Sequence, residues 1–273
     1  MRAAVAVIQA WGAAFIAAFQ FLTRLPLPVT LHYDDALFRR SVVFYPVVGL
    51  VLGWLLAAAG KLLLLVVPPL PAASLLLGFW IALTGALHLD GLMDTADGIL
   101  SHRSRERMLE IMKDSRVGAM GVIACVVVLL LKWSLLLELL SGPAGGSSDA
   151  LLLLPLATIW SRWFMVAAIS RWPYARAEQG GGMGGMFRGI GWNTLLLQSV
   201  VAAAASWFTV SVTSASGHGL VTVAIFGAAA LVAGWLIARY IGGKLGGLTG
   251  DTYGALNELL ETLLLLVMLW LLS

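Results

Sequence analysis

Three aspartates lie close together in the segment His88-Leu89-Asp90-Gly91-Leu92-Met93-Asp94-Thr95-Ala96-Asp97-Gly98. At about 100° per residue, Asp90, Asp94 and Asp97 fall within about 60° of one another around a helix. Like charges on one face repel, and an apolar neighbourhood raises the cost of leaving them uncompensated. A hard divalent cation removes both penalties, and oxygen ligands favour Mg²⁺ or Mn²⁺ over Zn²⁺. The spacing therefore predicts a metal site at these aspartates, and a solvated helix end is the alternative.

Residues next to this segment are candidates to complete the site. His88 lies about 160° from Asp90, which favours a structural histidine over a general base or a support for the aspartates. Asp114 precedes an apolar run, so it either caps the next helix or supplies a fourth carboxylate ligand. Lys113 and Arg116 stand where a polyphosphate bound to the metal would need cationic partners. We therefore expect both to contact a diphosphate.

Two glycine-rich stretches carry further candidates. In the first, Gly184 and Gly185 expose backbone N–H groups that suit a phosphate, although a flexible linker fits the composition equally well. The second leads into Asp251, Asn257 and Glu258. Asp251 and Glu258 are seven residues apart and share a helical face, which indicates a second polar cluster. Asp251 alternatively caps the last helix.

The composition indicates that lipid is the main solvent of the chain. Of its 273 residues, 60% are hydrophobic and 11% are charged, and the mean hydropathy is +0.93. Soluble domains are nearer to about 45–50% apolar and about 25% charged. We expect an all-α, polytopic membrane helical bundle. The single cysteine, Cys125, excludes a disulfide framework and a cysteine metal cage. The net charge is +3, but basic residues in a membrane protein report its topology, so we expect no nucleic-acid partner.

About seven transmembrane helices are expected, in one domain covering residues 1–273. Residues 3–22 form a further helix that either spans the bilayer or lies at its interface. The expected spans are 41–67, 72–89, 117–140, 151–169, 194–212, 220–241 and 255–272.

Basic residues mark one side of the membrane. Thirteen of the seventeen lie in connections that alternate with connections lacking lysine and arginine. Cytoplasmic loops carry the excess of Lys and Arg, so we expect these connections and the aspartates in the cytoplasm. Lys61 and Lys132 are expected to reach toward an interface, whereas Arg162 either pairs with acids or binds a substrate phosphate. The thirteen are Arg24, Arg39, Arg40, Arg103, Arg105, Arg107, Lys113, Arg116, Arg171, Arg176, Arg188, Arg239 and Lys244.

Five motifs follow one another over most of the chain. The motifs are Phe21-Leu22-Thr23-Arg24-Leu25-Pro26, Phe44-Tyr45-Pro46-Val47-Val48-Gly49, the aspartate segment from His88 to Gly98, Met112-Lys113-Asp114-Ser115-Arg116-Val117-Gly118, and Gly247-Leu248-Thr249-Gly250-Asp251-Thr252-Tyr253-Gly254-Ala255. Together and in this order, they resemble the cobalamin synthase family, also called adenosylcobinamide-GDP ribazoletransferases.

The resemblance implies a Mg²⁺-dependent enzyme of the bacterial inner membrane that joins adenosylcobinamide-GDP to α-ribazole or its 5′-phosphate and releases GMP. A homo-oligomer is left open. The expected metal ligands and catalytic residues are Asp90, Asp94, Asp97 and Asp114. The expected substrate contacts are His88, Lys113, Arg116, Arg162, Gly184, Gly185, Asp251, Asn257 and Glu258.

Two other functions fit parts of the pattern. A CDP-alcohol phosphotransferase also places aspartates at cytoplasmic helix ends, but Asp94-Thr95 stands where that family has Ala-Arg. A cation or proton transporter would use buried acids, which it normally places near the middle of a span.

Overall fold

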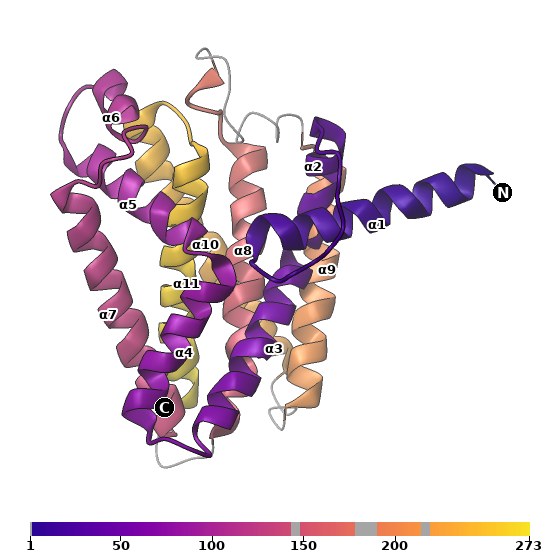
Figure 1. The fold of residues 1–273 in the computed structure, drawn as a ribbon, viewed down its shortest axis with the longest axis vertical. Coiled ribbons are helices and arrows are strands. Elements are labelled where there is room, and N and C mark those ends of the chain that lie inside the picture. Colours follow the sequence, from indigo (N-terminus) through magenta and orange to yellow (C-terminus); the bar gives the residue numbers. More distant parts are fainter. Residues whose placement is uncertain (1, 143–147, 178–189, 214–218) are drawn as a thin grey trace.

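A computed structural model describes residues 2–142, 148–177, 190–213 and 219–273, and nearly all regular structure in these ranges is helical. Most of the long helices run side by side as a bundle, which confirms the expected all-α fold (Figure 1). The helices are α1 (Arg2–Leu22), α2 (Asp35–Ser41), α3 (Tyr45–Leu63), α4 (Pro69–Thr84), α5 (Leu87–Leu100), α6 (Arg105–Ile111), α7 (Ala119–Ser141), α8 (Leu154–Arg171), α9 (Trp192–Val212), α10 (Gly219–Leu245) and α11 (Gly250–Leu272), with short 3₁₀ helices at Val42–Phe44 and Ser148–Leu153.

Seven helices in the described ranges are long and apolar enough to cross a membrane, and α4 with α5 forms an eighth candidate that is bent by 89°. Although α1 is one of the seven, it lies across the direction of the bundle (Figure 1). Its first half extends from the bundle, and Val5, Val7 and Ile8 are 48%, 56% and 70% exposed. This orientation favours a helix that lies in the interface over one that spans the bilayer.

The expected span 72–89 is wrong at its end, because the helix breaks after Thr84. Gly85 and Ala86 both adopt the left-handed conformation, with φ of 62° and 57°. Arg24 holds the break from outside: its backbone N–H donates to the Leu83 carbonyl at 2.7 Å, and its side chain occupies the space that a Cβ on Gly85 would need. At about 1.5 Å per residue, the 14-residue α5 is also too short to cross a bilayer of about 30 Å.

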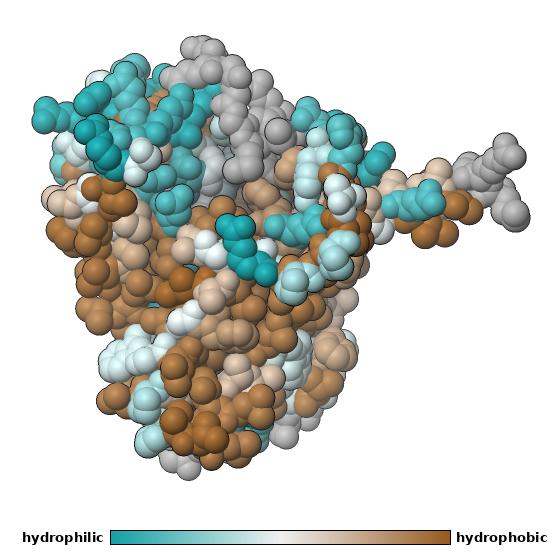
Figure 2. All heavy atoms as spheres, in the orientation of Figure 1, coloured by the Kyte–Doolittle hydropathy of each residue, from teal (hydrophilic) through white to brown (hydrophobic). Residues whose placement is uncertain are grey.

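Polar and apolar side chains separate along the bundle. Hydrophilic residues gather at the end that holds α2, α5 and α6, and hydrophobic residues cover most of the remaining visible face (Figure 2). The outward faces of α7 and α10 are apolar, with Val127, Leu130, Val232 and Leu236 each more than half exposed. Because exposed apolar area of this extent is costly in water, these faces are suited to lipid. We call the hydrophilic end the polar end.

The segment after α8 is attached to the segment before α11 at the polar end. Leu248 donates its N–H to the Pro173 carbonyl and accepts from the N–H of Ala175, both at 2.8 Å. Arg105 of α6 donates from Nε to the Leu245 carbonyl at 2.8 Å and from a terminal nitrogen to the Ala175 carbonyl at 3.1 Å. Because Ala175 is held by these bonds, the next residue, Arg176, lies beside the first turn of α11.

Candidate active site

Helix α5 presents its aspartates toward the first turn of α11. Asp90 is exposed, while Asp94 and Asp97 are half-buried. A Cβ on Gly91 would lie 2.5 Å from the Asp251 carbonyl oxygen, so the two helices approach this closely only because residue 91 is glycine. Asp94 is close enough to Asp90, Asp97 and Asp251 for their negative charges to act on its carboxylate. The spacing predicted a concentration of acidic groups on α5, and α11 adds Asp251 to it.

Asp97 binds the start of α7. Its two carboxylate oxygens accept the backbone N–H groups of Gly118 and Gly121, each at 2.7 Å. A carboxylate in this position satisfies donors that have no partner within the helix and interacts favourably with the helix dipole. The structure therefore supports a helix-capping role for Asp97, and its role as a metal ligand stays a prediction.

Asp114 lies in the exposed connection between α6 and α7 and pairs with Arg116. The guanidinium donates to both carboxylate oxygens, at 3.0 and 2.7 Å, and the backbone N–H of Arg116 adds a third bond at 3.1 Å. The hydrogen bonds from Arg116 lower the pKa of Asp114 to about 2. Helix α7 begins after Gly118 without a side-chain cap at that position, so the alternative in which Asp114 caps this helix is wrong.

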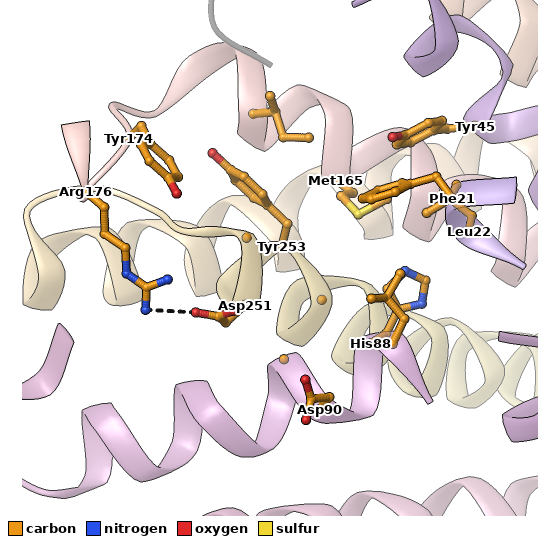
Figure 3. A pocket seen from close by; sticks show the side chains of 15 residues that line it. Phe21, Leu22, Tyr45, His88, Asp90, Met165, Tyr174, Arg176, Asp251 and Tyr253 are labelled. Carbon is orange, nitrogen blue, oxygen red and sulfur yellow. Dashed lines mark ion pairs between the residues drawn. The ribbon is translucent and has the colours of Figure 1, made fainter. Parts of the chain in front are cut away.

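A cavity of about 200 Å³ opens beside the aspartates, between α5, α8 and α11. Arg176 and Asp251 lie on one side of it, and His88 with Phe21, Leu22 and Met165 lies on the other (Figure 3). Asp90 belongs to its lining, as do the rings of Tyr174 and Tyr253, whereas Asp94, Asp97, Lys113 and Asp114 do not. The cavity therefore has one charged end and one apolar end.

The charged end contains a buried ion pair. A terminal nitrogen of Arg176 lies 3.0 Å from Asp251 Oδ2, and the two side chains are 10% and 25% exposed. The cap of α11 is Thr249, whose hydroxyl accepts from the N–H of Thr252, so the alternative in which Asp251 caps this helix is wrong. Asp251 instead faces the cavity, as expected for a substrate contact.

A second polar cluster, the interior ion cluster, lies inside the bundle and consists of Lys132, Arg162, Glu258 and Glu261. Lys132 Nζ lies 2.6 Å from Glu258 and 2.7 Å from Glu261, and Arg162 donates to the other oxygen of Glu261 at 2.7 Å. All four residues are buried, with at most 3% of any one exposed. The expectation that Lys132 reaches an interface is therefore wrong: its ammonium group lies between two carboxylates and over the ring of Trp80.

The expected substrate contacts are thus divided between two places. His88 and Asp251 line the cavity. Arg162, Asn257 and Glu258 lie outside its lining: Arg162 and Asn257 bind Glu261, and Glu258 binds Lys132. Lys113 and Arg116 lie in the exposed connection, and Gly184 and Gly185 lie outside the described residues. For these residues a substrate contact stays a prediction.

Sequence reasoning missed Glu261 and did not distinguish Arg176 from the other arginines. A spacing of three residues between Glu258 and Glu261, inside an apolar helix, was the available signal for an interior ion cluster. No feature of the neighbouring sequence distinguishes Arg176 from Arg171. In the structure the two differ, because Arg176 lines the cavity and the guanidinium of Arg171 lies 3.6 Å from the centre of the Trp192 ring.

The carboxylate oxygens of the aspartates are the type of ligand that Mg²⁺ prefers, but these side chains alone do not surround an ion. Within the described ranges, no group of three or more Asp, Glu, His or Cys side chains is arranged to hold a metal ion. Protein Mg²⁺ sites often use only one or two carboxylates, with water and substrate phosphates as the other ligands. Asp90 and Asp94, one helical turn apart with Asp251 nearby, meet that requirement.

The fold and the site together define a multi-pass helical membrane protein with a concentration of carboxylates beside a cavity at its polar end. Residues 14–269 match the family described as cobalamin-5-phosphate synthase. The chain belongs to this family.

Several bacterial relatives share the name adenosylcobinamide-GDP ribazoletransferase. The adenosylcobinamide-GDP ribazoletransferase of Brevibacillus brevis is 41% identical over 255 residues, which cover 93% of this chain and 97% of that protein. The protein of that name in Desulfitobacterium hafniense is 42% identical over 91% of this chain and 93% of its own length. The one in Pseudomonas aeruginosa is 40% identical over 93% and 96%. No solved structure matches the chain significantly.

Proposed function

We propose that this protein is an adenosylcobinamide-GDP ribazoletransferase that uses Mg²⁺ and works at the cytoplasmic face of the bacterial inner membrane. The observation that carries the proposal is the position of Asp90, Asp94, Asp251 and Arg176 beside one cavity in a member of this family. In the reaction, a ribose hydroxyl of α-ribazole or its 5′-phosphate attacks the phosphorus attached to cobinamide. The new P–O bond replaces the bond to GMP, which leaves, and the hydroxyl proton passes to a base.

Asp90 and Asp94 are the residues that would hold Mg²⁺, with Asp97 and Asp114 as the further predicted ligands. When bound, the ion would neutralise charge on the diphosphate and stabilise the departing phosphate. Such a cation would also offset the repulsion among Asp90, Asp94 and Asp251, beside which the described part of the chain places one arginine, Arg176. Phosphoryl transfer needs accurate positioning and charge neutralisation more than covalent help from the protein.

Arg176 is suited to orient the diphosphate. It is 9% exposed as a residue, it lines the cavity, and it is held between the segment after α8 and the first turn of α11. A buried guanidinium can donate to two phosphoryl oxygens at once. Asp251 holds this guanidinium in place from the other side. Lys113 and Arg116, in the exposed connection between α6 and α7, remain our predicted contacts for the diphosphate.

The distribution of basic residues supports a cytoplasmic site. Helix α6 and its flanks carry Arg103, Arg105, Arg107, Lys113 and Arg116, and this region lies at the polar end together with the aspartates. Because positively charged loops stay in the cytoplasm, the cavity would open there.

The two alternative functions have less support. Asp94-Thr95 stands at the position where CDP-alcohol phosphotransferases have Ala-Arg. Buried charges do occur within the spans, as a transporter requires, but the interior ion cluster pairs two cations with two carboxylates at 2.6–2.7 Å. Mutually neutralised side chains of this kind favour a structural role over ion transport.

The test is an assay of the purified chain in lipid nanodiscs with adenosylcobinamide-GDP, α-ribazole and Mg²⁺. We expect release of GMP, its loss with EDTA, and its recovery with excess Mg²⁺. Parallel reactions contain CDP-diacylglycerol with an alcohol, and liposomes are used to measure ion flux. Release of CMP, or ion flux without release of GMP, would refute the proposal.

A further inference from the structure

His88 is connected to the interior ion cluster through Asn257. Asn257 Nδ2 lies 3.0 Å from His88 Nδ1 and 3.2 Å from Glu261 Oε1. Glu261 in turn binds Lys132 through Oε2 and Arg162 through Oε1. The bonds form a continuous path from two buried cations to an imidazole in the wall of the cavity.

The path determines which way the Asn257 amide faces. Glu261 accepts from Lys132 at Oε2 and from Arg162 at Oε1, and a carboxylate paired with two cations accepts hydrogen bonds and does not donate them. The group of Asn257 that faces Glu261 must therefore be its NH₂, not its carbonyl oxygen. An NH₂ group has two hydrogens, so the same nitrogen donates one to Glu261 and one to His88.

The orientation of the amide in turn determines the tautomer of His88. A nitrogen that accepts a hydrogen bond carries no proton, so Nδ1 is unprotonated and the proton of the neutral ring is on Nε2. An imidazolium would point a second N–H at the Asn257 NH₂, so the 3.0 Å contact fits only a ring whose Nδ1 carries no proton. His88 is therefore a neutral ring whose Nε2 donates and does not accept.

The donor at Nε2 lacks a protein partner. His88 is 2% exposed and lines the cavity, and its Nε2 forms no hydrogen bond with any residue that the structure describes. The wall beside it is formed by Phe21, Leu22, Tyr45 and Met165, none of which carries a charge (Figure 3). A buried N–H without a partner is costly, so a ligand that supplies an acceptor here removes that cost. An apolar wall favours a neutral acceptor over a charged phosphoryl oxygen.

We propose that the apolar end of the cavity binds the heteroaromatic base of the acceptor nucleoside, and that His88 donates its Nε2–H to an unprotonated ring nitrogen of that base. The inference rests on the proposed function and names a subsite for it. The base of α-ribazole is a benzimidazole, a flat apolar bicycle with one unprotonated ring nitrogen once the other carries ribose. With the base at this end, the ribose extends toward Asp90 and Asp251 at the charged end.

The first test does not depend on catalysis. The full chain is labelled with ¹⁵N-histidine in nanodiscs, and the His88 signals are assigned by their absence in His88→Gln. We expect an unprotonated Nδ1 and a protonated Nε2, and a shift of the Nε2 signal when α-ribazole is added. An indole nucleoside, in which C–H replaces the ring nitrogen, should leave that signal nearly unchanged. A proton on Nδ1, or equal shifts with both nucleosides, would overturn the proposal.

The second test uses steady-state kinetics. Loss of the donor in His88→Leu should raise the KM for α-ribazole roughly tenfold, with the KM for adenosylcobinamide-GDP unchanged. His88→Gln, whose amide can still donate, should lie between His88→Leu and the unsubstituted protein. The penalty of His88→Leu should disappear with the indole nucleoside. A purely structural role would raise both KM values or reduce the amount of folded protein, and that outcome would contradict the proposal.

Failure of this inference is distinguishable from failure of the proposed function. If the unsubstituted protein releases no GMP, the proposed activity fails, while the tautomer and the nucleoside-dependent shift still decide the role of His88. If GMP is released at equal efficiency with α-ribazole and the indole nucleoside, the activity holds and the subsite is refuted.

Discussion

The polar end and the interior of the bundle both combine carboxylates with cations, but the two regions differ in charge balance. In the interior ion cluster, Lys132 and Arg162 balance Glu258 and Glu261. Beside the cavity, Arg176 is the one cation among the described residues that acts on Asp94 and Asp251, and Asp90 lies next to both. Buried charges are tolerated when each has a partner, whereas an uncompensated excess needs a ligand from outside. The interior is therefore a cluster of balanced charge, and the polar end is suited to receive a cation and a polyphosphate.

The largest effect is expected from breaking the balance of the interior. Lys132→Met leaves two buried glutamates facing one arginine, so the free energy of unfolding should fall by about 3–5 kcal/mol. Thermal unfolding in nanodiscs measures it. Adding Glu258→Gln restores equal numbers of charges, and the double variant should be more stable than Lys132→Met alone. Equal stability of the two variants would contradict a balanced cluster.

At the polar end, Asp94→Asn should impair catalysis and leave the fold intact. Loss of a carboxylate that holds the cation should reduce the rate of GMP release by about 100-fold or more. The thermal midpoint should stay the same or rise slightly, because one of several repelling charges is removed. Asp35→Asn is the matched control, since Asp35 lies on α2 in an exposed pair with Arg39. An unchanged rate in Asp94→Asn would refute the metal assignment.

A smaller effect is expected from Arg176, the cation that the described residues contribute to the lining of the cavity. Arg176→Gln should raise the KM for adenosylcobinamide-GDP by about tenfold, because a buried donor pair for the diphosphate is lost. Arg171→Gln serves as the control, because Arg171 lies over Trp192 and does not line the cavity. If both substitutions have the same effect, the position of Arg176 has no special role.

The smallest effect separates two roles for one aspartate. As a cap of α7, Asp97→Asn should cost about 1 kcal/mol of stability and only a few-fold in rate, since an amide can accept only one of the two N–H groups. If Asp97 is a metal ligand instead, the rate should fall as far as in Asp94→Asn. Thermal unfolding and GMP release, measured on the same preparation, distinguish the two results.

Some features of the site followed from local spacing. The helical period placed Asp90 and Asp94 on one face before any packing was known, because backbone geometry within a helix sets that angle. The amounts of apolar and charged residues predicted a bundle in lipid, and the basic connections predicted one polar end. Asp251 was singled out by its place after a glycine-rich stretch, and it does face the cavity.

Other features were invisible to the same reasoning. The path that joins Lys132, Glu261, Asn257 and His88 connects residues up to 169 positions apart, so no local pattern reveals it. The sequence allowed Asp114 to be a helix cap or a metal ligand and predicted a metal ligand at Asp97. In the fold, Asp97 binds the start of α7 and Asp114 binds Arg116. A carboxylate has several candidate partners nearby in sequence, and helix packing selects among them.

The sequence alone determined that lipid surrounds much of the chain and that the chain forms long apolar helices. It also determined that one helix carries several acids whose charge requires compensation. These properties depend on composition and on the geometry of one helix at a time. Tertiary structure decided which cation each acid meets, and hence which charges are satisfied within the protein. It also decided the proton position on His88, because that position depends on an amide and a carboxylate carried by another helix.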